Sequence, residues 1–152
     1  MIQRVQSLLL LITAGLAVIL MFVPVYELHN TVGQPGGSSD PQGVYIFSNE
    51  SHQGNALLLI INSVIGALAF VTIFMFKWRG LQIRMCNLGL LLTCLMIGLL
   101  FFLADTMSSN MNQRVEYKFG SYIPLIQLVL LFVSGKFIRK DEDLVRSADR
   151  LR

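Results

Sequence analysis

The sequence predicts an all-α membrane protein: a four-helix transmembrane bundle with a small extracytoplasmic β element and a cytoplasmic C-terminal helix. Of the 152 residues, 54% are apolar and only 14% are charged, whereas about a quarter of the residues of a soluble domain are charged. The apolar residues also gather in four stretches without Asp, Glu, Lys or Arg, at residues 8–26, 56–76, 85–103 and 119–135. Each stretch has about the length that a helix needs to cross roughly 30 Å of hydrocarbon.

The first stretch is expected to be an uncleaved span and not a secretory signal. It exceeds the roughly 7–15 apolar residues of a signal peptide, and residues 24–29 offer no small-residue cleavage pattern. We expect a single membrane domain over residues 1–152. Its spans are predicted at 8–26, 56–76, 85–103 and 119–138, its outer loops at 27–55 and 104–118, and its tail at 139–152.

Lysine and arginine orient the spans, because cytoplasmic loops carry an excess of these residues. The side that holds both termini collects ten of them, namely Arg4, Lys77, Arg79, Arg84, Lys136, Arg139, Lys140, Arg146, Arg150 and Arg152. The opposite side has only Arg114 and Lys118. The sequence therefore predicts that both termini are cytoplasmic.

Small residues indicate how two of the spans pack, because helices in lipid associate through close contacts and interhelical hydrogen bonds. Such residues line the second span at Ser63, Gly66 and Ala67, and the third at Gly89, Thr93, Cys94 and Gly98. We expect these two spans to pack along these stripes as an antiparallel hairpin.

Two amides, Asn62 and Gln127, are expected at similar depth, roughly 10–13 Å below the outer ends of their spans. Equal depth permits a hydrogen bond between them, worth on the order of 0.6 kcal/mol. The amides would either hold helices together or line a polar path. Together with Ser63 and Thr93 they are interpreted as intramembrane packing residues, because the spans contain none of the charged residues that mark transport paths.

The sequence predicts no enzyme, cofactor or metal site. Cys86 and Cys94 lie in one span, about 12 Å apart along a helix, which is too far for a disulfide. His29 and His52 in the first outer loop match no metal-ligand spacing. The chain also lacks paired carboxylates, a phosphate-binding loop and a nucleophile motif.

Both outer loops contain a β-prone run, at residues 43–48 and 114–119. Because the two loops lie on the same side of the membrane, we expect the runs to form or extend a small sheet that caps the bundle. An isolated hairpin is marginal in water, so the sheet should rest on the helix ends or on a partner.

The tail, residues 139–152, is expected to continue the fourth span as a helix with one narrow apolar stripe. The stripe and the basic residues beside it are Leu144, Val145, Ala148, Leu151, Arg146 and Arg150. This surface would either lie on anionic lipid, attracted by its basic residues, or dock a partner protein. The acidic run at 141–143 weakens attraction to lipid, so the six residues are interpreted as a partner-binding surface.

Motifs at both ends of the chain carry a resemblance to a known family. The chain begins with MIQRVQS at residues 1–7 and ends with RKDE at 139–142 and LVRSADRLR at 144–152. This pairing resembles a family of small four-span inner-membrane proteins of Bacteroidota, catalogued as a domain of unknown function. The resemblance covers the whole chain and implies an inner-membrane location with both termini in the cytoplasm. It implies no activity and no catalytic residues.

Such a chain is compatible with three classes of function. A non-enzymatic membrane subunit or scaffold, which binds partners of an envelope complex through the outer loops and the tail, agrees best with uncharged spans and a patterned tail. A small oligomeric transporter or channel would line its pore with Asn62, Thr93 and Gln127. An enzyme is least favoured. The expected partners are the lipid bilayer and a membrane protein or further copies of the chain, and not nucleic acid.

Overall fold

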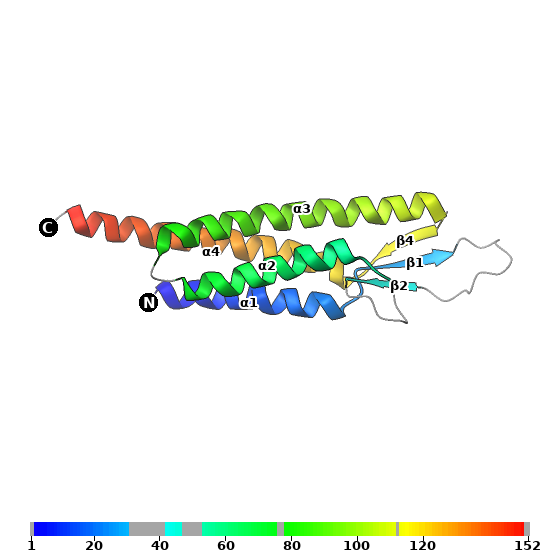
Figure 1. Cartoon of the computed structure of the whole chain (residues 1–152), viewed down its shortest axis with the longest axis horizontal. Coiled ribbons are helices and arrows are strands. Elements are labelled where there is room, and N and C mark those ends of the chain that lie inside the picture. The colour runs from blue at the N-terminus through cyan, green and yellow to red at the C-terminus, as the bar shows by residue number, and fades with distance from the viewer. Residues whose placement is uncertain (1, 31–41, 47–52, 76–77, 112, 151–152) are drawn as a thin grey trace.

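The computed structural model describes residues 2–30, 42–46, 53–75, 78–111 and 113–150. Its main elements are four long helices that run side by side along one axis (Figure 1). They are α1 (Ile2–Phe22), α2 (Ala56–Phe74), α3 (Arg79–Met111) and α4 (Ile123–Arg150). All four are long and apolar enough to cross a membrane. The predicted fold class, a four-helix membrane bundle with a small β element, is confirmed.

The bundle is closed by contacts between neighbouring helices: α1 packs against α2 and α4, and α3 packs against the same two helices. The predicted pairing of α2 with α3 is confirmed, but the predicted packing along their small residues is wrong. A Cβ added at Gly66 would lie 3.0 Å from the Cβ of Ala17 in α1, and one at Gly89 would meet Leu131 in α4. Gly66 therefore faces α1 and Gly89 faces α4, whereas Gly98 has no atom within 4 Å of a built Cβ.

The first span ends earlier than predicted. Helix α1 stops at Phe22, and Tyr26, the last residue of the predicted span 8–26, is the first residue of a strand. Pro24 explains the early end, because a proline disfavours helical backbone at the residue before it, here Val23.

Helix α3 is longer than the predicted span 85–103 at both ends. It has 33 residues and includes polar segments before and after the apolar stretch. The predicted second outer loop, 104–118, therefore begins inside this helix. The absence of charge marks the part of a helix that can lie in hydrocarbon, and it does not mark where the helix ends.

Helix α4 continues through Arg150, which confirms the prediction that the tail extends the fourth span as a helix. It begins at Ile123, after a 3-10 turn at Phe119–Tyr122 that occupies the start of the predicted span. Pro124 is accommodated because it lies in the first helical turn, where the backbone N–H has no helical partner.

A four-stranded sheet forms at one end of the bundle, in the order β3-β2-β1-β4. The strands are β1 (Tyr26–Asn30), β2 (Gln42–Tyr45), β3 (Gln53–Gly54) and β4 (Gln113–Tyr117). The predicted runs become β2 and β4, although residues 47–48 lie outside the described part of the chain. The two runs do not pair with each other: both pair antiparallel with β1, a strand that the sequence reading had divided between a span and a loop.

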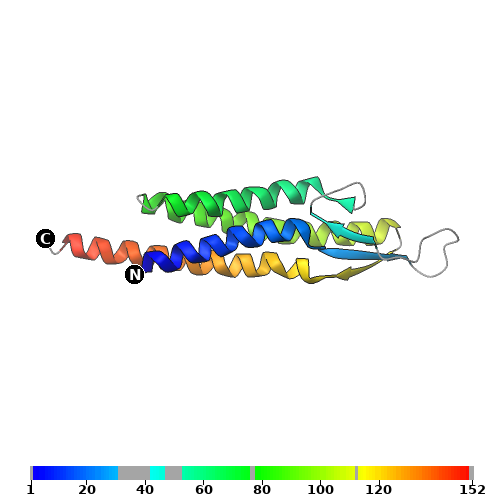
Figure 2. The ribbon, with the colours of Figure 1, turned by 90° about the horizontal axis from the view of Figure 1, so that it is seen from below.

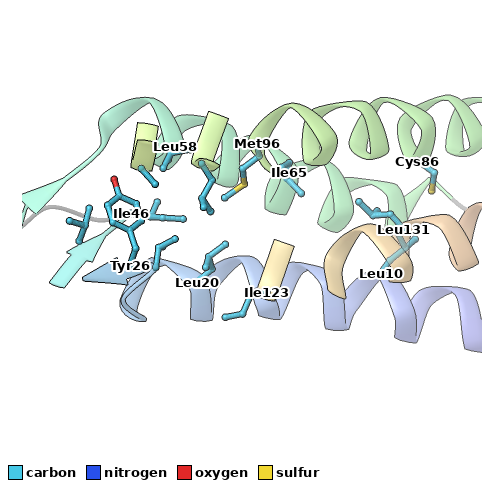
Figure 3. Packing of buried hydrophobic residues seen from close by; sticks show 14 of the residues in the cluster. Leu10, Leu20, Tyr26, Ile46, Leu58, Ile65, Cys86, Met96, Ile123 and Leu131 are labelled. Atoms are coloured by element: carbon cyan, nitrogen blue, oxygen red, sulfur yellow. The ribbon is translucent and has the colours of Figure 1, made fainter. Parts of the chain in front are cut away.

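The two ends of the molecule differ. Both chain termini lie at one end, the tail end, and the sheet lies at the other, the sheet end (Figure 1). The last part of α4 continues past the start of α1, as the view from below shows (Figure 2). One buried cluster connects the ends, from Leu10 and Leu131 among the helices to Tyr26 and Ile46 in and beside the sheet (Figure 3).

Candidate functional site

The two intramembrane amides are fully buried, and both bind α1. Asn62 of α2 donates from Nδ2 to the carbonyl oxygen of Ala17 at 2.7 Å. Gln127 of α4 donates from Nε2 to the carbonyl oxygen of Thr13, at a longer distance of 3.5 Å. Thr13 and Ala17 are one helical turn apart and lie on the same face of α1. The predicted bond between the two amides is therefore wrong, because α1 packs against both of their helices and supplies nearer acceptors.

These amides specify which helix faces meet more than they stabilise the bundle. An interhelical hydrogen bond in a membrane contributes on the order of 0.6 kcal/mol. The second polar atom of each amide, Oδ1 of Asn62 and Oε1 of Gln127, is buried without a partner among the described residues. Such an atom costs about 1–3 kcal/mol of desolvation, which offsets the gain from the bond.

The two predicted hydroxyl residues bond within their own helices. Thr93 is fully buried in α3 and donates to the carbonyl oxygen of Gly89 at 2.8 Å. Ser63 is exposed on the surface of α2 and donates to the carbonyl oxygen of Leu59 at 2.7 Å. Asn62, Thr93 and Gln127 are thus buried inside the bundle, whereas Ser63 lies on its surface.

Ser63 borders a shallow groove between α1 and α2 that has a volume of about 310 Å³. Its lining is mostly apolar and consists of Ala14, Ala17, Val18, Met21, Asn62, Ser63, Gly66, Ala67 and Phe70. Small residues on both helices create the hollow, because their side chains do not fill the space between the two backbones.

Sequence reasoning missed a contact near the tail end. Gln82 of α3 is buried and donates from Nε2 to the carbonyl oxygen of Thr72 in α2, at 3.3 Å. This bond ties the two helices beside their connection. Gln82 precedes the predicted span 85–103, so the apolar pattern gave no reason to expect it inside the bundle.

The predicted partner surface of the tail is described only in part. Arg139 donates to Oδ1 of Asn87 at 3.2 Å, which ties the start of the tail to α3. Leu144 is 52% exposed. Val145, Arg146, Ala148 and Arg150 belong to α4, but their side chains lie outside the described part, as does all of Leu151. The partner-binding role of these six residues stays a prediction.

At the sheet end, a lysine connects two strands. Lys118 Nζ lies 3.1 Å from Glu27 of β1 and 3.1 Å from Glu116 of β4. Hydrogen bonds to the side chains of Glu27 and then Glu116 raise the pKa of Lys118 above its usual value. Burial is the main cause that raises the pKa of Tyr26, which lies in β1 on the buried face of the sheet.

The sheet is joined to α4 through closely packed backbone. The N–H of Lys118 donates to the carbonyl oxygen of Val25 at 3.0 Å, and the N–H of Gly120 donates to that of Pro24 at 3.2 Å. The hydroxyl of Ser121 also donates to the carbonyl oxygen of Val25. The 3-10 turn before α4 is thereby fixed against the segment that follows α1.

Within the described part of the chain, no group of three or more His, Cys, Asp or Glu residues is placed to hold a metal ion. Cys86 is buried, Cys94 is exposed, and both are free thiols.

No curated protein and no solved structure gives a significant match to the chain. A family model described as "Domain of unknown function (DUF4293)" matches residues 2–151. The resemblance to an uncharacterised family is confirmed, and the chain belongs to the DUF4293 family.

Proposed function

We propose that the protein is a non-enzymatic integral membrane subunit or scaffold that binds partner proteins of an envelope complex. It lies in the cell inner membrane with both termini in the cytoplasm, and its partners bind the sheet end on the outside and the tail within the cell. The alternative, a small oligomeric transporter or channel, would need a polar path through the helices.

The observation that carries the proposal is that two helices project beyond the bundle at opposite ends. Helix α2 has 19 residues and is about 28 Å long, close to the thickness of the hydrocarbon core. Helix α3 has 33 residues and α4 has 28, or about 50 and 42 Å. The excess of α3 lies beside the sheet, and the excess of α4 forms the tail (Figure 1). The helical backbone thus extends beyond the bundle at both ends, which supports one partner surface at the sheet end and another at the tail.

The charges support the proposed orientation. The start of α3 and the last part of α4 lie at the tail end (Figure 1), and these segments carry basic residues such as Arg84 and Lys140. The sheet end carries Glu27 and Glu116 beside Lys118. An excess of lysine and arginine on one side is typical of the cytoplasmic side.

The buried polar groups favour packing over transport. Asn62, Gln127 and Gln82 donate to main-chain carbonyl groups of neighbouring helices, and Thr93 donates within its own helix. Each of these donors already has an acceptor inside the bundle, and the three amides bond between helices. Replacing Asn62 and Gln127 by leucine tests the transporter alternative. A transporter with these residues in its path would lose substrate flux in reconstituted vesicles, whereas a scaffold transports no substrate.

Co-purification tests the proposed function directly. The tagged full chain is extracted in mild detergent, and partners are quantified by mass spectrometry beside a chain that ends at residue 138. Leu144→Ser, in the apolar stripe, and Asp143→Ser, its exposed neighbour, form a matched pair. A stoichiometric partner should remain with Asp143→Ser and be depleted by Leu144→Ser and by the truncation.

Two results would count against the proposal. If no partner co-purifies in stoichiometric amount, the role as a subunit is wrong. If the truncated chain retains every partner, the tail is not the binding surface.

A further inference from the structure

The strand β4 lies at the edge of the sheet and has main-chain groups that no described residue pairs. It pairs with β1 in a register that places Glu116 opposite Glu27. The N–H of Lys118 donates to Val25, and main-chain groups of successive residues in a strand point to alternate sides. The N–H and C=O groups of Val115 and Tyr117 therefore point away from β1, and no described residue bonds them.

A cleft of about 360 Å³ lies along this strand, between β4 and the projecting part of α3. Its walls are Ala104, Asp105 and Ser108 from α3, and Arg114, Val115 and Tyr117 from β4. The ring of Tyr117 packs edge-on against Phe101 of α3, with ring centroids 5.4 Å apart. Val115 packs against the buried cluster. Both walls are therefore held in place before anything binds, and Figure 1 shows β4 running beside the end of α3.

The two walls of the cleft carry opposite charges. Asp105 projects from α3 and Arg114 belongs to β4, and both side chains are exposed. Neither forms an ion pair within the described part of the chain. A ligand in the cleft thus meets a carboxylate on the helix side, a guanidinium on the strand side, and a row of main-chain donors and acceptors.

We propose that this cleft binds an extended segment of a partner polypeptide, which adds a fifth strand to the sheet beside β4. Main-chain hydrogen bonds to Val115 and Tyr117 supply affinity without regard to sequence, and side-chain contacts supply specificity. A basic side chain of the segment pairs with Asp105, and an acidic one pairs with Arg114. The inference rests on the proposed scaffold function and identifies one of its partner surfaces.

A second copy of the chain does not fit this edge. Copies inserted in one membrane with the same orientation run their β4 strands in the same direction, because the strands follow the long axis of the bundle (Figure 1). A two-fold axis normal to the membrane then places identical groups at the same height, so that N–H faces N–H and C=O faces C=O. A copy related by this two-fold axis therefore cannot pair along β4, and we assign the edge to an extended segment of another polypeptide.

The test uses the full chain in lipid nanodiscs and a phage-displayed library of random dodecapeptides, with empty nanodiscs for counter-selection. Val115→Pro removes one outward N–H, and proline is tolerated on an edge strand where the N–H does not belong to the ladder. Val115→Ala is the matched control, since it shortens the same side chain and keeps the N–H. Asp105→Lys reverses the charge of one wall without changing the strand.

Enriched peptides should bind the wild-type and Val115→Ala chains alike and bind Val115→Pro at least tenfold more weakly. Asp105→Lys should select against basic residues in the peptide. Bound peptide should slow hydrogen exchange at the amides of Val115 and Tyr117. The exchange measurement needs no variant, so it still tests the proposal if Val115→Pro disrupts the pairing of β4 with β1.

The proposal is wrong if no peptide is enriched over empty nanodiscs, or if the peptides leave exchange at Val115 and Tyr117 unchanged. Because the library holds random peptides and no native partner, its result is independent of the co-purification experiment. If a native partner binds through the tail but no peptide is selected at β4, this binding site is wrong and the scaffold function still stands.

Discussion

Gly120 occupies a close backbone contact between the sheet end and the start of α4, so a methyl group there should destabilise the protein. A Cβ at this position would lie 2.4 Å from the carbonyl oxygen of Pro24, 2.9 Å from its carbonyl carbon and 3.1 Å from the Cα of Val25. All three are main-chain atoms, which cannot rotate away as a side chain can. Gly120→Ala must therefore shift the two segments apart by about 1 Å to restore ordinary contact.

The expected cost follows from two opposing effects. Overpacking a close contact costs about 1–3 kcal/mol, and the shift also lengthens the hydrogen bond from Gly120 to Pro24, now 3.2 Å. Replacing glycine by alanine restricts the unfolded chain, which returns about 0.4–1 kcal/mol. The net expectation is a loss of about 1–2 kcal/mol in the free energy of unfolding.

Gly98→Ala is the matched control, because no atom lies within 4 Å of a Cβ built at Gly98 in the middle of α3. Alanine there should leave stability unchanged or raise it by up to about 1 kcal/mol. Reversible denaturant unfolding in detergent micelles measures both variants against the wild type. If Gly120→Ala proves as stable as Gly98→Ala, the close contact between the sheet end and α4 is wrong.

Two further predictions concern the amides and the sheet. Asn62→Leu should change the free energy of unfolding by less than about 1 kcal/mol, because it removes both a weak interhelical hydrogen bond and a buried unpaired acceptor. A loss above about 3 kcal/mol would contradict this and show that the amide stabilises the bundle. The sheet should weaken in alkali, because the folded-state pKa values of Lys118 and Tyr26 are both raised. Their contribution is complete below the unfolded pKa values, near 10, and is lost as pH rises through the folded ones. Near-UV circular dichroism follows this transition as pH is raised. The loss of signal should be shallower in Lys118→Met, and an identical profile in that variant would show that Lys118 does not contribute to the pH dependence.

The sequence was sufficient to predict four helices and a small sheet, because burial in hydrocarbon demands long uncharged segments and the runs that become β2 and β4 are β-prone. It was insufficient for the ends of α3, since charged residues such as Arg84 and Asp105 are compatible with helix outside the hydrocarbon. Strand β1 was missed because Tyr26 extends an apolar run. Its place as an inner strand depends on pairing with β4, far away in the chain.

The partners of the amides were also beyond prediction. Position along a span gives the depth of Asn62 and Gln127, but not the direction in which each faces around its helix axis. That direction depends on how all four helices pack, and it brings each amide to α1. The cleft beside β4 was missed for a related reason: Asp105 and Arg114 line the same cleft only because α3 continues beyond its uncharged stretch and β4 folds back along it.

The most direct test of the account is the topology of the chain in its membrane. Asp143→Cys on the tail and Glu116→Cys on β4, both at exposed positions, are made singly in a chain with Cys86→Ala and Cys94→Ala. Right-side-out and inverted membrane vesicles are then treated with a maleimide that does not cross membranes. We expect labelling of Glu116→Cys only in right-side-out vesicles and of Asp143→Cys only in inverted ones. Labelling of both from the same side would contradict four spans with the sheet and the tail on opposite sides.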